Sequence, residues 1–318
     1  MATSNLDLDI SLFALSKQEQ MIRVCKFLGL PGEGWSLVDG QIACSSLTWT
    51  HQDWILQRRT RSRYRRMQTI YQASLGLDGV LPGFRYHGPL VKFEDNQPVA
   101  TNERWLGAEF FWIAQPRLEG QVMFGLEHSP AQILDNLRLA APKVAQDLAW
   151  LAEQKLDLDE LCKTLPSHGL VQQNTSMQVL KQSMVIVDQQ LRSIAENMGY
   201  AEPGSQAMLS HGDPTLKNLV RTPDGPQLID WESVWLLPRH RDFTHQVAFL
   251  CKYLPGEYWQ EAMRIVWNSA KEQLPGWNWQ QWQQACVWQI LREAIFFPPS
   301  PETRQGFMQA LSQAAGQA

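Results

Sequence analysis

The chain has 318 residues, of which 44% are hydrophobic and 19% charged, and its formal net charge is −4. This composition excludes an intrinsically disordered chain, because such chains are too polar to bury a core. The mildly acidic charge argues against a nucleic-acid partner, and no run of about 18 apolar residues predicts a membrane span. The five cysteines are far apart, which indicates reduced thiols. Together with an N-terminal stretch unlike a signal peptide, they favour a cytoplasmic location.

The first predicted element is a helix. Ser16 and Glu19 form the pattern of a capping box, and apolar residues follow at helical spacing until Gly29. A run of arginines begins at Arg58 and leads into a second helix, which is predicted to end at Leu75. Short strands are predicted over residues 35–38, 42–50, 54–57, 84–87, 90–93 and 99–103.

From about Leu106 onward the chain is predicted to be mainly helical. Long amphipathic helices are expected over residues 133–151 and 178–198, where apolar residues recur three and four apart. Residues 209–231 are the exception, since a Thr-Pro-Asp-Gly turn there predicts short strands on either side. The sequence therefore predicts an α+β protein with a small, strand-rich lobe over residues 1–105. A larger, mainly helical lobe is expected over residues 106–318.

The segment LSHGDPTLKNLVRTPDGPQLIDWES, residues 209–233, carries the candidate chemistry. Asp213 lies in a His-Gly-Asp-Pro turn, Asn218 follows five residues later, and Asp230 ends the next apolar stretch. A hairpin through the intervening turn would bring Asp230 back close to Asn218. A loop carboxylate can accept a hydroxyl proton, while Asn218 and Asp230 offer the oxygen ligands that magnesium takes. Because phosphoryl transfer requires such a base beside a metal, the segment predicts a kinase.

The same segment resembles the signature of the aminoglycoside phosphotransferase and choline kinase-like family, His-Gly-Asp-x-x-x-x-Asn followed by a strand and Ile-Asp-Trp/Phe-Glu. The resemblance implies a bilobal, protein-kinase-like fold and transfer of phosphate from ATP or GTP to a small-molecule hydroxyl with Mg²⁺. It makes residues 1–105 the nucleotide-binding lobe and places the catalytic loop and the substrate site in the helical lobe, residues 106–318. It makes Asp213 the catalytic base, and Asn218 and Asp230 the metal ligands. His211 and Asp242 are expected to brace the catalytic loop, with a simple helix N-cap as the alternative for Asp242.

The nucleotide-binding part of the family pattern is matched less well. The family has a Lys or Arg at the end of a strand, where it contacts the nucleotide phosphates, and the aligned residue here is Gln57. Arg58 and Arg59 follow it, but a shift by one residue turns a side chain to the other face of the sheet. A bulge that restores Arg58, use of Arg59, and loss of the contact therefore remain open. Glu103 resembles the start of the family's hinge, which would contact the nucleotide.

Two classes of function follow from these residues. The first is an active small-molecule kinase, and the alternative is a catalytically impaired kinase-like binding or scaffold protein. The joint presence of Asp213, Asn218 and Asp230 favours the enzyme, because a scaffold needs none of them. The expected acceptor is a small molecule such as an amino alcohol, a thiamine-like cation, a sugar or an aminoglycoside. Neither a nucleic acid nor a membrane is an expected partner.

Two features of the helical part bear on the acceptor. Acidic and basic residues after Leu254 nearly balance, which argues against a polycationic antibiotic as substrate. Six tryptophans lie between Trp259 and Trp288. A cage for an ammonium group is one interpretation of these rings, and packing in the core is the favoured one.

Overall fold

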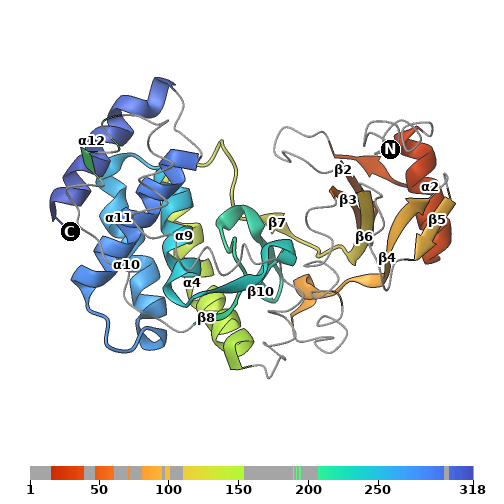
Figure 1. Cartoon of the computed structure of the whole chain (residues 1–318), viewed down its shortest axis with the longest axis horizontal. Helices are drawn as coiled ribbons and strands as arrows, with labels where there is room; N and C mark the ends of the chain where they lie inside the picture. Colours follow the sequence, from red (N-terminus) through yellow and green to blue (C-terminus); the bar gives the residue numbers. More distant parts are fainter. Residues whose placement is uncertain are drawn as a thin grey trace, which may run out of the picture. The chain divides into compact units, whose positions relative to one another are not determined.

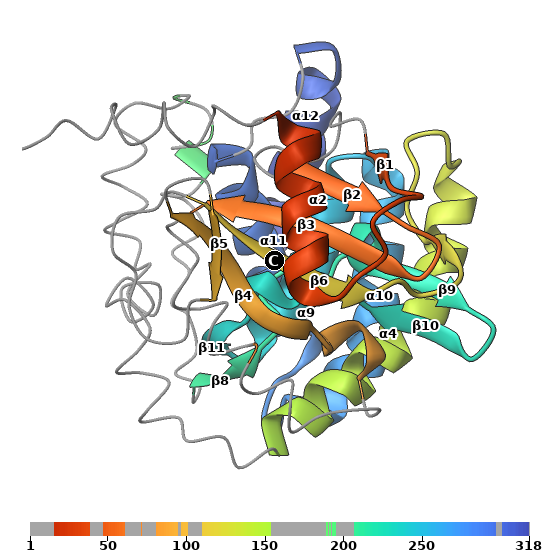
Figure 2. The same cartoon turned by 90° about the vertical axis from the view of Figure 1, so that its right-hand side faces the viewer.

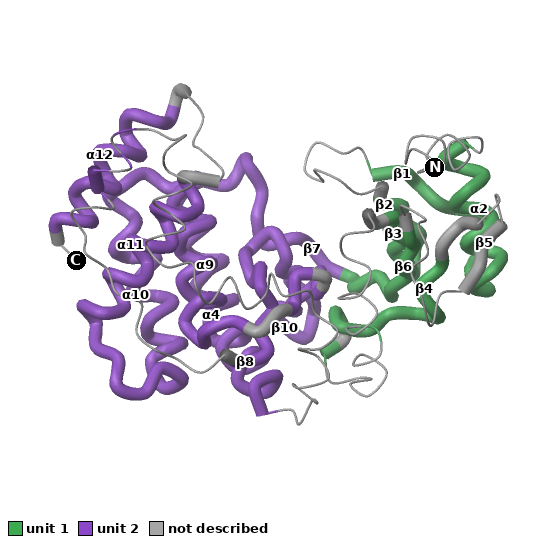
Figure 3. Tube along the Cα trace, viewed as in Figure 1, with its two compact units in different colours: residues 1–119, 159–164 green, residues 120–158, 165–318 purple. Residues whose placement is uncertain are grey.

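The structure is a computed structural model. It describes residues 16–38, 47–60, 71, 81–94, 97–100, 110–153, 189, 191, 193–194, 207–296 and 301–317. The chain forms two compact units, Met1–Glu119 with Asp159–Thr164, and Gly120–Leu158 with Leu165–Ala318 (Figure 3). The first unit contains a six-stranded sheet and the second is mainly helical (Figure 1). The α+β class predicted from the sequence is confirmed.

The first unit begins with helix α2 (Lys17–Leu28), which has the predicted ends. The Ser16 hydroxyl accepts the backbone N–H of Glu19 at 3.2 Å, and the Glu19 carboxylate accepts the backbone N–H of Ser16 at 2.8 Å. Gly29 closes the helix at φ +69°, a left-handed conformation that costs glycine little. The predicted capping box and helix stop are therefore confirmed.

The described strands of this unit form one antiparallel sheet, in the order β1-β2-β3-β6-β4-β5. Helix α2 lies across one face of it (Figure 2). Met21 and Val24 of the helix share a core there with Leu56 and Trp112 of the sheet. The strands are β1 (Ser36–Leu37), β2 (Leu47–Thr50), β3 (Trp54–Thr60), β4 (His87–Glu94), β5 (Gln97–Ala100) and β6 (Phe110–Pro116).

Strand β6 lies inside the sheet although helix was predicted from about Leu106, so that prediction was wrong here. Phe111, Trp112, Ile113 and Ala114 are at most 2% exposed, which means that both faces of the strand are buried. Such a strand has no alternation of polar and apolar residues, and that alternation is the pattern that identifies a strand in a sequence. The strand predicted over residues 84–87 was also wrong, because Pro82–Phe84 forms a 3₁₀ turn and β4 begins at His87.

Among the described residues the second unit has five long helices, in which α9 packs against α10 and α11, and α10 against α4. The helix predicted over 133–151 is confirmed by α4. The helix predicted over 178–198 lies outside the described residues, apart from four helical positions within it. The helices are α4 (Pro130–Glu153), α9 (His240–Cys251), α10 (Trp259–Ala270), α11 (Trp279–Phe296) and α12 (Pro301–Gln317).

Tryptophans of α10 and α11 contribute to the core of this unit. Trp259, Trp282 and Trp288 are buried, and the indole N–H of Trp282 donates to the carbonyl of Met263 at 3.0 Å. Trp267 lies with its ring centroid 5.8 Å from that of Trp282. The interpretation as core packing is therefore confirmed for these rings. No helix among the described residues is long and apolar enough to span a bilayer.

Short strands of the second unit lie in and around the segment of residues 209–233. Strands β9 and β10 form a hairpin in which Thr222 pairs with Gly225 and Leu219 with Leu228. Strand β7 pairs with the other edge of β9, and β11 pairs with β8. The strands predicted around the Thr-Pro-Asp-Gly turn are confirmed. The strands are β7 (Gln121–Val122), β8 (Ala207–Ser210), β9 (Leu219–Thr222), β10 (Gly225–Leu228) and β11 (Trp235–Pro238).

Candidate active site

The loop between β8 and β9 holds Asp213, and a close backbone approach shapes it. Gly212 has φ +83°, and a Cβ added to it would lie 2.0 Å from the carbonyl oxygen of Ser233. An L-residue would be strained at this φ, and its Cβ would collide with a backbone atom. The loop therefore needs glycine immediately before Asp213.

Asp242, in the first turn of α9, holds the start of this loop. Its carboxylate accepts the backbone N–H of His211 at 2.7 Å and that of Gly212 at 2.9 Å. Burial raises the pKa of Asp242 to about 6, against the opposite effect of these two hydrogen bonds. The N-cap residue of α9 is Arg239, so the alternative in which Asp242 caps its own helix is wrong.

His211 is completely buried and connects the loop to the end of β10. Its Nδ1 accepts the backbone N–H of Asp213 at 3.2 Å, so Nε2 carries the hydrogen and donates to the carbonyl of Ile229 at 3.0 Å. Burial lowers the pKa of His211 to about 4, which keeps the ring neutral. With both nitrogens used in this way, His211 does not serve as a general base.

The Asp213 carboxylate accepts four hydrogen bonds. Its Oδ1 accepts the hydroxyl of Thr215 at 3.1 Å and Nε2 of His245 at 3.0 Å. Its Oδ2 accepts Nδ2 of Asn218 at 3.0 Å and Nζ of Lys217 at 2.9 Å. Two of the four donors are cations, so the negative charge of Asp213 is closely compensated.

The electrostatics of this cluster keep Asp213 ionised. Burial by itself would raise the pKa of Asp213, but the hydrogen bond and charge of His245, together with Lys217, hold it well below its usual range. Burial likewise opposes the charged form of Lys217, yet Asp213 and Asp230 raise its pKa. The Lys217 ammonium also lies 5.6 Å from the centre of the Phe249 ring, within reach of a cation–π contact.

Asn218 and Asp230 lie at the same end of the β9–β10 hairpin. The backbone N–H of Ile229 donates to the carbonyl of Asn218 at 2.9 Å, and Asp230 is the next residue. Asp230 has φ +63°, and it is the one residue other than glycine with positive φ among the described residues. A non-glycine residue held there is typical of a functional position. The hairpin thus brings together the regions of Asn218 and Asp230.

The donor atoms at this end of the hairpin suit a hard cation. The amide nitrogen of Asn218 donates to the Asp213 carbonyl at 2.9 Å as well as to its carboxylate, so the amide oxygen is left for a ligand. That oxygen and the Asp230 carboxylate match the preference of magnesium, which completes its shell with water and phosphate. Among the described residues no group of three or more His, Cys, Asp or Glu could hold a metal by itself.

The residues expected to contact the nucleotide phosphates lie in the first unit. Strand β3 pairs with β6 in unbroken register from Trp54 to Thr60, so the bulge that would restore Arg58 is absent from this pairing. Arg58 shares the face of Leu56, and its guanidinium donates to Gln20 of α2 at 3.2 Å. The side chain of Arg59, the second candidate, lies outside the described residues.

Other expectations for the first unit fall largely outside what the structure describes. Glu103 lies outside the described residues. The helix predicted to follow the arginine run likewise lies outside the described residues apart from position 71, and Arg58 and Arg59 take part in β3 as strand residues.

Three charged residues of the cluster were missed by sequence reasoning. Lys217 stands inside the recognised motif, and its position four residues after Asp213 was a usable signal. His245 lies one helical turn after Asp242, on the helix that braces the loop, which was a weaker signal. Glu293, on α11, is brought to His245 only by helix packing, and the sequence offered no signal for it.

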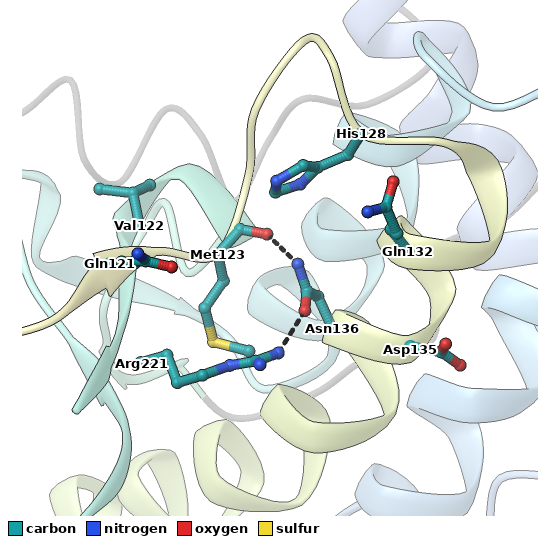
Figure 4. A pocket seen from close by; sticks show the side chains of 8 residues that line it. All are labelled: Gln121, Val122, Met123, His128, Gln132, Asp135, Asn136 and Arg221. Carbon is teal, nitrogen blue, oxygen red and sulfur yellow. Dashed lines mark hydrogen bonds between the residues drawn. The ribbon is translucent and has the colours of Figure 1, made fainter. Parts of the chain in front are cut away.

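The second unit also holds a pocket of about 310 Å³ between β7, the start of α4 and Arg221 of β9 (Figure 4). The Asn136 side chain lines this pocket. Its amide nitrogen donates to the carbonyl of Met123 at 2.6 Å, and its amide oxygen accepts from Arg221 at 2.5 Å. Its lining residues do not include Asp213, Asn218 or Asp230. The pocket is therefore separate from the cluster around Asp213.

Comparisons with known proteins show the fold. No protein-family model matches the sequence, and a search of curated proteins finds no match. The GDP complex of an aminoglycoside 2'-phosphotransferase-IIIa superposes with a TM-score of 0.58 at 10% identity, covering 93% of this chain and 97% of that one. Amicoumacin kinase in complex with AMP-PNP and Ca²⁺ superposes with a TM-score of 0.59 at 9% identity, and the match covers 94% of each chain. Choline kinase from Cryptosporidium parvum superposes with a TM-score of 0.51 at 10% identity, and the match covers 95% of this chain and 94% of that one. The chain thus has the protein-kinase-like fold of these small-molecule kinases, as its sequence predicted.

Proposed function

We propose that this protein is a phosphotransferase of the aminoglycoside phosphotransferase and choline kinase-like family, which moves the terminal phosphate of ATP or GTP to a hydroxyl group of a small molecule. The observation that carries the proposal is the cluster of Asp213, Asn218 and Asp230 at one end of the β9–β10 hairpin. Phosphoryl transfer is catalysed mainly by positioning and by neutralisation of charge. An ionised carboxylate beside two oxygen ligands for a cation supplies what that chemistry needs.

In this proposal Asp213 binds the acceptor hydroxyl and receives its proton. Because His245 and Lys217 keep the pKa of Asp213 low, it is a weak base. Its main contribution is therefore to orient the hydroxyl oxygen toward the phosphorus, and it receives the proton once the new O–P bond is forming. This order suits the loose transition state of phosphoryl transfer, in which the nucleophile needs little activation.

Asn218 and Asp230 would hold the magnesium ion through their side-chain oxygens, and His211 and Asp242 would keep the loop in place. When bound, magnesium neutralises the negative charge of the phosphates. The Asn218 amide links the two roles, since its nitrogen donates to Asp213 while its oxygen is left for the cation. Either Arg59 contacts the phosphates from the first unit, or this contact is absent.

The acceptor we propose is a small alcohol such as an amino alcohol, a thiamine-like cation or a sugar. The near balance of charge after Leu254 argues against a polycationic aminoglycoside as the preferred substrate. Phosphorylation of aminoglycosides alone, in a screen over a panel of such alcohols, would reverse this preference.

The function is tested by two variants of the candidate site. Asp213→Ala should lower phosphate transfer by about 100-fold or more and leave the affinity for Mg–ATP within about twofold, because it removes the group that orients the acceptor. Asp230→Ala should instead weaken magnesium-dependent nucleotide binding by about 10-fold or more, because it removes a metal ligand. Binding is measured by titration calorimetry and transfer with radiolabelled ATP.

Asp224→Ala is the matched control, since Asp224 is an exposed aspartate in the turn of the same hairpin. It should behave as wild type in both assays. Equal turnover by wild type and Asp213→Ala would refute the catalytic assignment. A wild-type protein that binds no Mg–ATP at about 1 mM nucleotide would favour the scaffold protein instead.

A further inference from the structure

His245 connects Asp213 to a second buried carboxylate. Its Nε2 lies 3.0 Å from Oδ1 of Asp213, and its Nδ1 lies 3.0 Å from Oε1 of Glu293. An ionised carboxylate can only accept hydrogen bonds, so each ring nitrogen must carry a hydrogen. His245 is therefore an imidazolium ion between two carboxylates.

Glu293 is itself held in place on α11. Lys252 donates to its Oε2 at 2.8 Å, Gln289 donates to its Oε1 at 3.2 Å, and the side chain is only 12% exposed. Charges of alternating sign thus run from Lys252 through Glu293 and His245 to Asp213. Removal of one member would leave its buried neighbours with less compensation of their charge, which is costly, so each member helps to hold the next in place.

The four donors to the Asp213 carboxylate differ in how far their side chains are exposed. Four hydrogen bonds already occupy the carboxylate, so an acceptor hydroxyl can bind only where one donor gives way. Thr215 is fully buried, Asn218 is 6% exposed and the His245 side chain is 19% exposed. The Lys217 side chain is 39% exposed and ends a flexible stem, which makes it the partner that can leave Oδ2.

We propose that His245 is a positioning residue for phosphoryl transfer, which fixes Oδ1 of Asp213 so that Oδ2 is presented to the acceptor hydroxyl when Lys217 gives way. The proposal rests on the proposed function, since it concerns the same carboxylate. His245 acts through Asp213 and touches neither the nucleotide nor the acceptor. Glu293 and Lys252 hold the imidazolium in place.

The test separates the orientation of Asp213 from binding and from folding. We expect His245→Gln to lower kcat by about 10- to 100-fold, the cost of a small misplacement of a reacting group. The affinity for Mg–ATP should stay within twofold of wild type. We expect Glu293→Gln to lower kcat as well, by a smaller factor than His245→Gln does. His128→Gln is the control, since His128 lies in the same unit and outside the cluster, and it should leave kcat unchanged.

Either of two kinetic results overturns the proposal. One is an unchanged kcat per folded molecule in His245→Gln. The other is an equal loss of kcat and of nucleotide affinity, which indicates a general structural role. A measurement that needs no turnover is the ¹⁵N spectrum of His245 at pH 8. We expect both ring nitrogens to be protonated in wild type, and a neutral ring overturns the proposal. If the wild type binds no nucleotide but its His245 ring is charged, the proposed function is contradicted. The row of alternating charges from Lys252 to Asp213 is then still supported.

Discussion

At the scale of single residues, Asp213 shows how a buried charge is kept in a protein. Desolvation alone would favour the neutral acid, yet two cations and two neutral donors surround the carboxylate. The same carboxylate is thereby a weak base and a well-oriented one. A residue in this state is suited to hold a hydroxyl group in line with a phosphate, because alignment contributes more to this reaction than proton abstraction does.

The charge of His245 makes stability depend on pH. Burial opposes the charged ring, but its hydrogen bonds to Asp213 and Glu293 outweigh burial and raise the pKa of His245 to about 9. The pKa of the ring is 6.5 in the unfolded chain, so below pH 6.5 the charged ring contributes its full stabilisation to the fold. This stabilisation is lost as the pH rises through the folded-state pKa of about 9. Between these pH values the free energy of unfolding of wild type should fall by up to about 3 kcal/mol more than that of His245→Gln. Urea titrations across the range measure the difference, and equal pH dependence in both proteins would contradict a charged ring.

At the scale of elements, the loop that carries Asp213 is held from three directions. Helix α9 binds its start through Asp242, the end of β10 binds His211, and the turn before β11 approaches Gly212. None of these contacts lies within the loop itself. These contacts add to the hydrogen bonds that Thr215 and Asn218 make to Asp213 within the loop, so changes that disturb the packing of the elements should move Asp213.

Gly212 is the position where this packing can be tested. Gly212→Ala must place a Cβ against the Ser233 carbonyl, whereas Gly225, also at positive φ, has nothing within 4 Å of an added Cβ. Gly225→Ala should cost about 1–2 kcal/mol for the left-handed backbone alone. Gly212→Ala should cost about 1–3 kcal/mol beyond that, because the backbone has to shift. Chemical denaturation gives both values, and equal costs would mean that the close approach is unimportant.

At the scale of the whole molecule, each unit has a core of its own. The first is built around α2 and the sheet, with Leu56 at 0% exposure, and the second around α9, with Leu250 at 0%. Units with separate cores often unfold in separate steps, which violates a simple two-state description.

Calorimetry should therefore resolve two unfolding transitions. Leu56→Ala should lower one of them and Leu250→Ala the other, each by about 2–5 kcal/mol, since both remove buried methyl groups and leave a cavity. A single transition that both variants lower equally would show that the chain unfolds as one cooperative body.

The sequence by itself determined those features that depend on neighbours along the chain. The capping box at Ser16 and the glycine at Gly29 predicted both ends of α2, and the Thr-Pro-Asp-Gly turn predicted the β9–β10 hairpin. Because the pairing of that hairpin follows from its turn, the sequence also predicted that Asn218 and Asp230 lie near each other. The resemblance of these motif residues to the signature of a kinase family implied the fold.

Only the tertiary structure decided the features that depend on burial and on contacts between distant segments. Strand β6 could not be recognised from the sequence, because both of its faces are buried. The resulting run of apolar residues also occurs in a buried helix. Arg58 faces α2 because the strand continues without a bulge. His245 is charged because Asp213, from a loop, and Glu293, from another helix, both lie within hydrogen-bond distance of its ring. A carboxylate's surroundings, and hence its strength as a base, are set by the side chains that folding brings near it in space.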